Sequence, residues 1–366
     1  MIQESQLQFE RQARRPGQPR DLRGFIRQLD EANLLTRVAE PVEWKYDLGR
    51  RTRESHGPVL FENVVDYAGQ SVFTNGLSTA GCFALALGLR QDTPLSETVA
   101  VARQRLCTPI PPRIVDESPV LDNQRDTGDL NLYSLPVPHW NERDAGRYLG
   151  TWHLNITKDP ESGIRNVGVY RMQLLGPRDA TVSTYAGSGL ARHVARAEQS
   201  HQALPVAVAI GVPEPVIMAG AAAFPPDEDE LEFAGALRQQ PLDLISCRTI
   251  DLEVPAESEI AIEGVIHPHR RVQDGPFFDF MGKPHTNPAA FYFEAKRLMF
   301  RDRPILRGAS VGNPGAEDHQ LFAFLAELGL VDFGGAELLR RRMFRAFQSI
   351  ARMQSGSDKS AAARPD

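Results

Sequence analysis

The sequence predicts an α+β protein with more than one domain. The chain has 366 residues, which is longer than the size at which one hydrophobic core is usual. Short strand-like runs and helical patterns share residues 21–112, whereas strand-like runs predominate from residue 151 onward. An apolar content of 42% with 24% charged residues is typical of a globular protein.

Charge and composition exclude several functional classes. The net charge of −6 argues against a general nucleic-acid binder, which is normally basic. Residues 1–20 are polar, and no apolar run in the chain is long enough for a secretory signal or a membrane span. The three cysteines, Cys82, Cys107 and Cys247, form no CxxC pair. We interpret them as reduced thiols in a cytoplasmic protein.

The first domain is expected at residues 21–112, after a polar arm at residues 1–20. Asp21 is suited to cap a helix, because its side chain can accept a hydrogen bond from a free backbone N–H. The apolar residues that follow recur at helical spacing: Leu22, Phe25, Ile26 and Leu29. Beyond them the sequence predicts strands at residues 58–64 and 71–74 and helices at residues 78–89 and 96–106.

In the central region, residues 113–310, strand-like sequence patterns predominate from Thr151 onward. Many strands with few helices indicate a barrel or sandwich whose site lies at a rim or groove. Helices are predicted at residues 189–199 and 229–237. Strands are predicted at residues 152–157, 166–175, 180–185, 205–211, 244–254, 259–272, 290–301 and 304–308.

The C-terminal region, residues 311–354, is expected to be helical. Amphipathic patterns predict helices at residues 317–328 and 336–353. The composition of residues 355–366 is that of a disordered tail.

Two carboxylates stand five residues apart in Asp274-Gly-Pro-Phe-Phe-Asp279. The Gly275-Pro276 pair predicts a sharp bend that turns both acids toward one pocket. Phe277, Phe278 and Phe280 would keep water away from them, and such a setting can raise and separate their pKa values. The alternative is a solvated turn, because Asp-Gly and Gly-Pro are common loop dipeptides.

Arg171 belongs to a predicted strand at residues 166–175. Alternation places Asn166, Gly168 and Tyr170 on one face, and Val167, Val169 and Arg171 on the other. An arginine on an apolar face requires a carboxylate or an anionic ligand, unless it is a surface residue at the strand end. Gly168 would let a flat ligand approach the backbone.

Glu230 and a histidine pair are the candidate metal ligands. Glu230 lies in an acidic run at an expected helix start, where a solvated acidic turn is the alternative to coordination of Mg²⁺, Mn²⁺ or K⁺. His267 and His269 form an HxH pair, but no third ligand has the spacing of a zinc site. The chain contains no GxGxxG, Walker or GxSxG motif.

Six segments stand in collinear order over about residues 21–318. They are Asp21-Leu-Arg-Gly-Phe, Gly57-Pro-Val-Leu-Phe-Glu-Asn, Gly163-Ile-Arg-Asn-Val-Gly-Val-Tyr-Arg-Met-Gln, Glu230-Leu-Glu-Phe-Ala-Gly-Ala-Leu, Asp251-Leu-Glu-Val-Pro-Ala-Glu-Ser-Glu-Ile and Asp274-Gly-Pro-Phe-Phe-Asp279. Together they resemble the UbiD family of prenylated-FMN-dependent decarboxylases. The resemblance implies an N-terminal α/β domain and a central split β-barrel, related to flavin reductases, that binds the cofactor. We expect a shortened family member, with most of the C-terminal domain missing.

The family's Glu–Arg–Glu trio maps onto this chain residue by residue. Arg171 takes the place of the arginine, and Asp274 and Asp279 take the places of the glutamates. The resemblance implies cycloaddition of an unsaturated or aromatic acid to prenylated FMN, loss of CO₂, and proton donation by Asp279, while Asp274 and Arg171 orient substrate and cofactor. It implies that the cofactor is prenylated FMN or FMN. The residues implied to contact it are Asn166, Gly168, Val169, Tyr170, Arg171 and Glu230.

The same resemblance implies ions and partners. Asn166 and Glu230 match ligands of a divalent metal, Mn²⁺ or Mg²⁺, and K⁺ that hold the flavin phosphate. The partners are a small carboxylic acid, a prenyltransferase that supplies the cofactor, and further copies of the chain or a second subunit. No nucleic acid or membrane partner is expected.

Three departures keep other functions open. Both acids are Asp where relatives carry Glu, the family's metal-binding His falls at Gly187 while nearby His193 serves another position, and the chain stops near residue 366. The alternatives to a decarboxylase are a flavin-site protein with non-decarboxylating chemistry in specialised metabolism, and a non-catalytic subunit that depends on a partner.

Overall fold

The computed structural model describes residues 17–313 and 315–331. Most of the predicted N-terminal arm, the helix predicted at residues 336–353 and the predicted tail lie outside this part of the chain. Within it, no helix is both long and apolar enough to cross a membrane.

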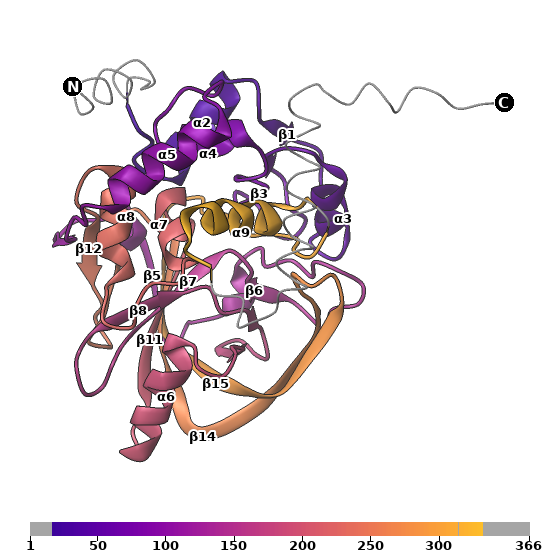
Figure 1. The fold of residues 1–366 in the computed structure, drawn as a ribbon. Helices are drawn as coiled ribbons and strands as arrows, with labels where there is room; N and C mark the ends of the chain where they lie inside the picture. The colour runs from indigo at the N-terminus through magenta and orange to yellow at the C-terminus, as the bar shows by residue number, and fades with distance from the viewer. Residues whose placement is uncertain (1–16, 314, 332–366) are drawn as a thin grey trace.

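A four-stranded sheet gathers the N-terminal strands with one strand from far along the chain. Its order is β1 (Thr36–Val38), β2 (Val59–Phe61), β3 (Ser71–Thr74) and β16 (Ile305–Arg307). β16 pairs in parallel with β3, so the strand predicted at residues 304–308 completes this sheet. The helices of this region are α2 (Leu22–Glu31), α3 (Asp47–Glu54), α4 (Ala80–Ala86) and α5 (Leu95–Leu106) (Figure 1).

The α2 helix begins as its sequence predicts. Asp21 accepts a hydrogen bond of 2.8 Å from the backbone N–H of Gly24, and the four predicted apolar residues are buried. Asp21 also lies 2.9 Å from Arg301, which follows the last long strand of the central sheet. The cap therefore also ties α2 to the central part of the fold.

Replacing Asp21 by Ala should lower the free energy of unfolding by about 1–2 kcal/mol, because the helix loses its cap and Arg301 loses one of its two carboxylate partners, Asp21 and Glu259. Urea denaturation measures this change. Asp21→Asn is the matched control, since it keeps the capping oxygen and removes only the charge, and it should lose less stability than Asp21→Ala. Equal stability of Asp21→Ala and the parent protein would contradict this account.

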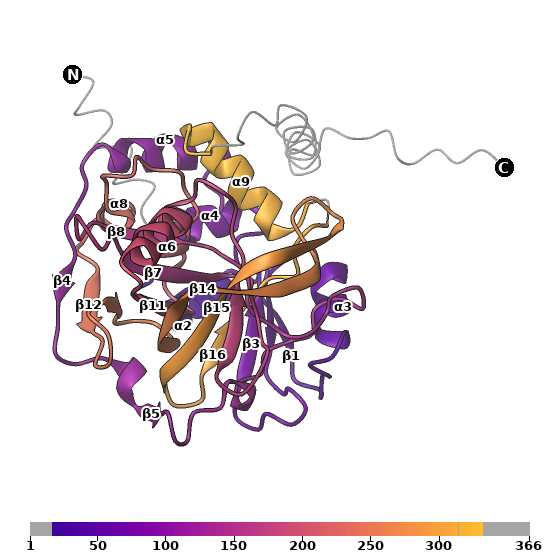
Figure 2. The ribbon, with the colours of Figure 1, turned by 90° about the horizontal axis from the view of Figure 1, so that it is seen from below.

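The central sheet is antiparallel and curled (Figures 1 and 2). Its order is β10-β15-β14-β11-β7-β8, and β5 pairs with β15. The strands are β5 (Asn123–Asp126), β7 (His153–Lys158), β8 (Arg165–Gly168), β10 (Asp179–Val182), β11 (Leu204–Ile210), β14 (Ile260–Phe278) and β15 (Pro284–Phe300).

Smaller elements complete the fold. One small sheet joins β4 (Arg113–Ile114), β12 (Asp243–Ser246) and β13 (Glu253–Pro255), and another joins β6 (Tyr148–Gly150) and β9 (Met172–Gln173). The remaining helices are η1 (Pro119–Leu121), η2 (Leu132–Ser134), α6 (Gly189–Gln199), α7 (Glu214–Gly220), α8 (Glu230–Arg238) and α9 (Glu317–Leu328).

The prediction of a sharp bend at Gly275-Pro276 was wrong. β14 continues through this pair to Phe278, which is paired with Pro284 of β15. The register shifts between Val272 and Asp274 and again between Asp274 and Phe277. These irregularities accommodate a proline, which has no N–H for the ladder, and a glycine at φ +96°. Both aspartates therefore lie toward the end of one long hairpin.

A buried ion network joins the N-terminal sheet to two helices of the later chain. The guanidinium of Arg307 in β16 lies 2.8 Å from Glu214 of α7 and 2.5 Å from Glu317 of α9. All three residues are buried, and burial raises the pKa of Glu214 while Arg307 opposes that rise. The stacked rings of Phe83 and Phe324, 4.7 Å apart, add an apolar contact between α4 and α9. The start of α9 is therefore held against β16 and α7.

Candidate functional site

Arg171 and Asp274 form a buried ion pair. Arg171 lies between β8 and β9, and its Nε and Nη2 lie 2.6 Å and 2.5 Å from Oδ1 of Asp274 in β14. The other oxygen, Oδ2, accepts a hydrogen bond of 2.6 Å from the Thr181 hydroxyl of β10. Asp274 is fully buried, so both of its oxygens are satisfied within the protein.

This pair confirms part of what the sequence predicted for Arg171. The expectation that the guanidinium needs a carboxylate partner was right. The expectation of continuous strand alternation from residue 166 to residue 175 was wrong, because β8 ends at Gly168 and β9 begins at Met172. Arg171 reaches Asp274 from the irregular segment between these strands.

Asp279 has a different environment from Asp274. It lies just beyond the end of β14, is half-buried, and accepts a hydrogen bond of 2.9 Å from the backbone N–H of Met281. Burial raises the pKa of Asp279, and the charges of Arg171 and His285 oppose the rise. Within the described residues Asp279 has no ion-pair partner, so one acid of the motif is neutralised by a cation and the other is not.

The aromatic residues of the motif differ in exposure. Phe277 is buried, its ring lies 4.2 Å from that of Tyr148, and the guanidinium of Arg171 lies 5.2 Å from its centroid. Phe280 is 37% exposed. The prediction that all three phenylalanines exclude water was therefore wrong for Phe280. Phe277 is the ring that covers the ion pair.

Asp144 is a third carboxylate near the hairpin end, and the sequence did not predict it. Its Oδ1 accepts a hydrogen bond of 2.8 Å from the N–H of Phe278, and its Oδ2 accepts one of 3.1 Å from the N–H of Asn141. Burial raises the pKa of Asp144 to about 6, and the charges of Arg53 and Arg171 lower it. The surrounding sequence has the pattern of an ordinary polar loop, with no motif to link it to a strand so far along the chain.

Asn166 and Glu230 are brought to the same place by β8 and α8. Oε2 of Glu230 accepts a hydrogen bond of 2.9 Å from the N–H of Val167, the residue after Asn166. Burial raises the pKa of Glu230 to about 7, and within the described residues no ion pair neutralises it. Its nearby cation, Arg165, is held by Asp229 and Glu253. A carboxylate without a neutralising cation, held against the strand that carries Asn166, offers the oxygen ligands that a hard cation prefers.

Gly189 at the start of α6 packs directly on Asn166. A Cβ added to Gly189 would lie 1.5 Å from the Oδ1 of Asn166, so no larger residue fits there without displacing this side chain. His193 of α6 instead contacts Thr157 of β7 at 2.8 Å, and burial lowers its pKa to about 4. No group of three or more His, Cys, Asp or Glu residues in the described chain is arranged to hold a metal ion.

Tyr170 covers the backbone of Gly168. A Cβ added to Gly168 would lie 2.6 Å from the tyrosine ring, whose hydroxyl lies 3.4 Å from the Nδ2 of Asn166. The Tyr170 ring therefore occupies the space on the side of Gly168 where a Cβ would lie, and a flat ligand was expected to approach the backbone there. Such a ligand would reach Gly168 from there only if Tyr170 moved. Val169 packs against the hydrophobic core.

The two histidines of the HxH pair have different partners. His267 lies 2.8 Å from Glu294, whereas His269 lies 3.4 Å from His201 at the end of α6. They do not act together as ligands in this arrangement.

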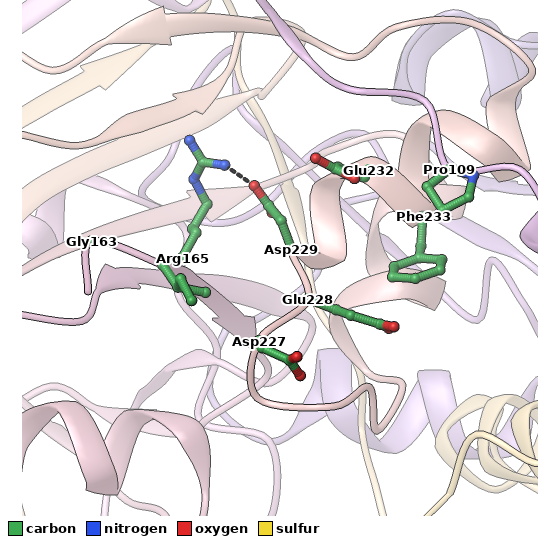
Figure 3. A pocket seen from close by; sticks show the side chains of 9 residues that line it. Pro109, Gly163, Arg165, Asp227, Glu228, Asp229, Glu232 and Phe233 are labelled. Atoms are coloured by element: carbon green, nitrogen blue, oxygen red, sulfur yellow. Dashed lines mark hydrogen bonds and ion pairs between the residues drawn. The ribbon is translucent and has the colours of Figure 1, made fainter.

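A pocket of about 420 Å³ opens beside the acidic start of α8 (Figure 3). Its carboxylates outnumber its single arginine, Arg165, which is paired with Asp229. It contains none of the three residues Arg171, Asp274 and Asp279, and its acidity does not suit an anionic substrate. The lining residues are Pro109, Gly163, Ile164, Arg165, Asp227, Glu228, Asp229, Glu232 and Phe233.

Two protein-family models match the chain. One is described as the 3-octaprenyl-4-hydroxybenzoate carboxy-lyase Rift-related domain, UbiD, and matches residues 113–314. The other is the N-terminal domain of the same carboxy-lyase and matches residues 26–101. The chain belongs to the UbiD family.

Curated relatives of this UbiD-family chain include phenolic acid decarboxylases. That of Streptomyces sp. (strain D7) is 32% identical over 311 residues, which cover 81% of this chain and 65% of the relative. That of Bacillus subtilis (strain 168) is 30% identical over 309 residues, with the same two coverages of 81% and 65%. The UbiD-family chain thus spans about 65% of the length of these relatives.

Solved UbiD-class structures have the same fold. The enzyme HmfF from Pelotomaculum thermopropionicum, in an evolved dimeric form with prFMN, superimposes with a TM-score of 0.79 at 30% identity, covering 84% of this chain and 71% of that one. The vanillic acid decarboxylase of Sedimentibacter hydroxybenzoicus in closed form gives a TM-score of 0.80 at 30% identity, covering 84% and 67%.

Proposed function

We propose that this UbiD-family chain is a decarboxylase that removes CO₂ from an α,β-unsaturated or (hetero)aromatic carboxylic acid, or adds it in the reverse direction, with prenylated FMN as cofactor. The observation that carries the proposal is the buried Arg171–Asp274 pair beside the unpaired Asp279. The names of the relatives, among them phenolic and vanillic acid decarboxylases, support this reaction class.

Asn166 and Glu230 are the residues we assign to the cation that holds the flavin phosphate. The fit rests on the carboxylate of Glu230, which is largely buried without a neutralising cation among the described residues. The resemblance also implies that Gly168, Val169, Tyr170 and Arg171 line the cofactor, and on the side that the Tyr170 ring covers, a contact with Gly168 requires that ring to move. Bound prenylated FMN would take up the electron pair released when the bond between the substrate carbon and its carboxylate breaks.

The protein's own groups then have distinct tasks. Arg171 presents a guanidinium whose charge favours a carboxylate substrate, and Asp274 holds that guanidinium in a fixed orientation. Phe277 shields the pair from water. After CO₂ leaves, the substrate carbon needs a proton, and we assign its delivery to Asp279, a half-buried carboxyl group without an ion-pair partner among the described residues, whose pKa is raised by burial.

Two alternative functions follow from specific features. Aspartate is one methylene shorter than the glutamate of relatives, which favours a flavin-site protein with different chemistry if Asp279 cannot reach the substrate. The other alternative is a non-catalytic subunit that depends on a partner. We also propose a cytoplasmic location and assembly into a homo-oligomer or with a second subunit.

Co-expression with a flavin prenyltransferase tests the proposal. The purified protein should be coloured, with the absorbance of a bound flavin, and should release CO₂ from members of a panel of acrylic and (hetero)aromatic acids. A coloured protein that releases no CO₂ would favour different flavin chemistry. A colourless protein that cannot be reconstituted would leave only the subunit role.

Gly189→Ala should reduce the flavin retained after gel filtration several-fold, because the new methyl group would displace Asn166 from the cation site. The readout is the ratio of flavin absorbance to protein absorbance. Gly128→Ala is the matched control, since a Cβ there meets no atom within 4 Å. Full flavin retention in Gly189→Ala would remove Asn166 from the cofactor site.

A further inference from the structure

The two residues that flank Asp279 are each held by a side chain from a distant part of the chain. Before Asp279, the N–H of Phe278 donates to Oδ1 of Asp144 at 2.8 Å. After Asp279, the carbonyl of Phe280 accepts from Nε2 of His319 in α9 at 2.8 Å. The backbone of Asp279 itself closes the turn through its N–H to the carbonyl of Lys283.

Asp144 acts from a loop that is itself anchored to the hairpin. The N–H of Ala145 donates to the carbonyl of Pro276 at 2.6 Å, and Nε2 of His139 donates to the carbonyl of Asp144 at 2.9 Å. Asp144 is 7% exposed, and its second oxygen is occupied by the N–H of Asn141. The loop therefore presents a fixed acceptor to the strand rather than a mobile surface acid.

His319 acts from the first turn of α9. Because its Nε2 donates to a carbonyl, that nitrogen carries a proton, and the buried Nδ1 has no hydrogen-bond partner in the described part of the chain. The preceding Asp318 accepts a hydrogen bond of 3.1 Å from the N–H of Gly312. A Cβ on Gly312 would lie 2.2 Å from the carbonyl oxygen of Asp279, so this loop also packs against the same turn.

We propose that Asp144 and His319 are positioning residues that fix the backbone on both sides of Asp279 and so direct its carboxyl group toward the substrate. This inference rests on the proposed role of Asp279 as proton donor. Aspartate has fewer side-chain torsions than glutamate, so the place of its carboxyl group depends more directly on the backbone. A misplacement of about 1 Å at a reacting group can cost about 10²-fold in rate.

The test compares four variants of the full-length protein loaded with flavin. Asp144→Ala and His319→Ala remove each contact. Asp144→Asn keeps an acceptor for the N–H of Phe278, and His319→Gln keeps an N–H at the position of Nε2. The control is Asn131→Ala, which loses a comparable hydrogen bond of 3.0 Å to a backbone N–H, that of Tyr133, in another loop.

Amide hydrogen exchange gives a readout that does not depend on turnover. In the two alanine variants, exchange over residues 278–283 should be about 10-fold faster, because one hydrogen bond contributes roughly that factor. The conservative variants should regain most of the protection, and the control should exchange like the parent. Unchanged exchange over residues 278–283 in both alanine variants would overturn the inference.

Steady-state kinetics give the second readout. Each alanine variant should lower kcat by about 10–100-fold, with KM and flavin retention close to those of the parent. Faster exchange with an unaltered kcat would overturn the positioning role. If the parent protein itself releases no CO₂ while the exchange result is as expected, the proposed function fails and the two contacts stand. If an alanine variant does not fold, exchange over residues 278–283 and kcat are compared between the conservative variant at that position and the parent. Faster exchange in that variant with an unaltered kcat would overturn the positioning role.

Discussion

Replacing Asp279 by Asn should lower the rate of CO₂ release by about 10²–10⁴-fold while leaving the flavin bound. Asparagine has nearly the same shape and keeps an oxygen for the N–H of Met281, which Asp279 now binds at 2.9 Å. It has no acidic proton to give to the substrate carbon. The ion pair between Arg171 and Asp274 does not involve Asp279, so the rest of the site should be undisturbed.

Single-turnover and steady-state CO₂ release, together with the flavin content of each preparation, measure this effect. Asp251→Asn is the control, because Asp251 is fully exposed and lies far from the hairpin end in sequence. Parent-like activity in Asp279→Asn would remove Asp279 from the mechanism. Loss of both flavin and activity would instead indicate that Asp279 holds the cofactor site together.

Replacing Arg171 by Ala should destabilise the fold by about 3–5 kcal/mol, the usual consequence of removing one partner from a buried pair. Asp274 is fully buried, and without Arg171 its carboxylate would keep only the Thr181 hydroxyl as a direct partner. The variant should also lose flavin during gel filtration, because the proposed cofactor contact of Arg171 is lost. Urea denaturation and flavin absorbance measure the two effects separately.

A double variant separates stability from function. Arg171→Ala combined with Asp274→Asn should recover part of the lost stability, since no buried charge is left unpaired, but should not recover flavin or activity. Arg271→Ala is the matched control, because Arg271 pairs with Glu198 near the surface and should contribute at most about 1 kcal/mol. Full stability, flavin retention and activity in Arg171→Ala would refute both roles of Arg171.

The elements with strong periodicity could be predicted from the sequence. The helices at residues 189–199 and 317–328 have the bounds that their patterns predict. α3 was missed, because Asp47–Glu54 is almost entirely polar and only Leu48 shows an apolar side. The end of β14 was also missed, since Gly-Pro is typical of a bend and nothing local indicates that a bulge keeps the strand paired.

The candidate site could be predicted only where a physical need was visible in the sequence. An arginine among valines needs a carboxylate, and Asp274 is that carboxylate. Asp144 had no such indication, because its contact with Phe278 joins positions separated by 134 residues. Local patterns describe single elements, whereas this contact depends on how a loop packs against a strand.

The parallel pairing of β16 with β3 determines whether the two segments matched by the family models can be separated. The family models match residues 26–101 and 113–314 as separate segments, yet β16 belongs to the second segment and completes the sheet of the first. If the first segment were produced alone, β3 would lack its neighbour β16. The edge of β3 would then expose unpaired backbone groups, which invites aggregation. The first segment is therefore not a self-contained module, because its sheet is complete only with β16 of the second segment.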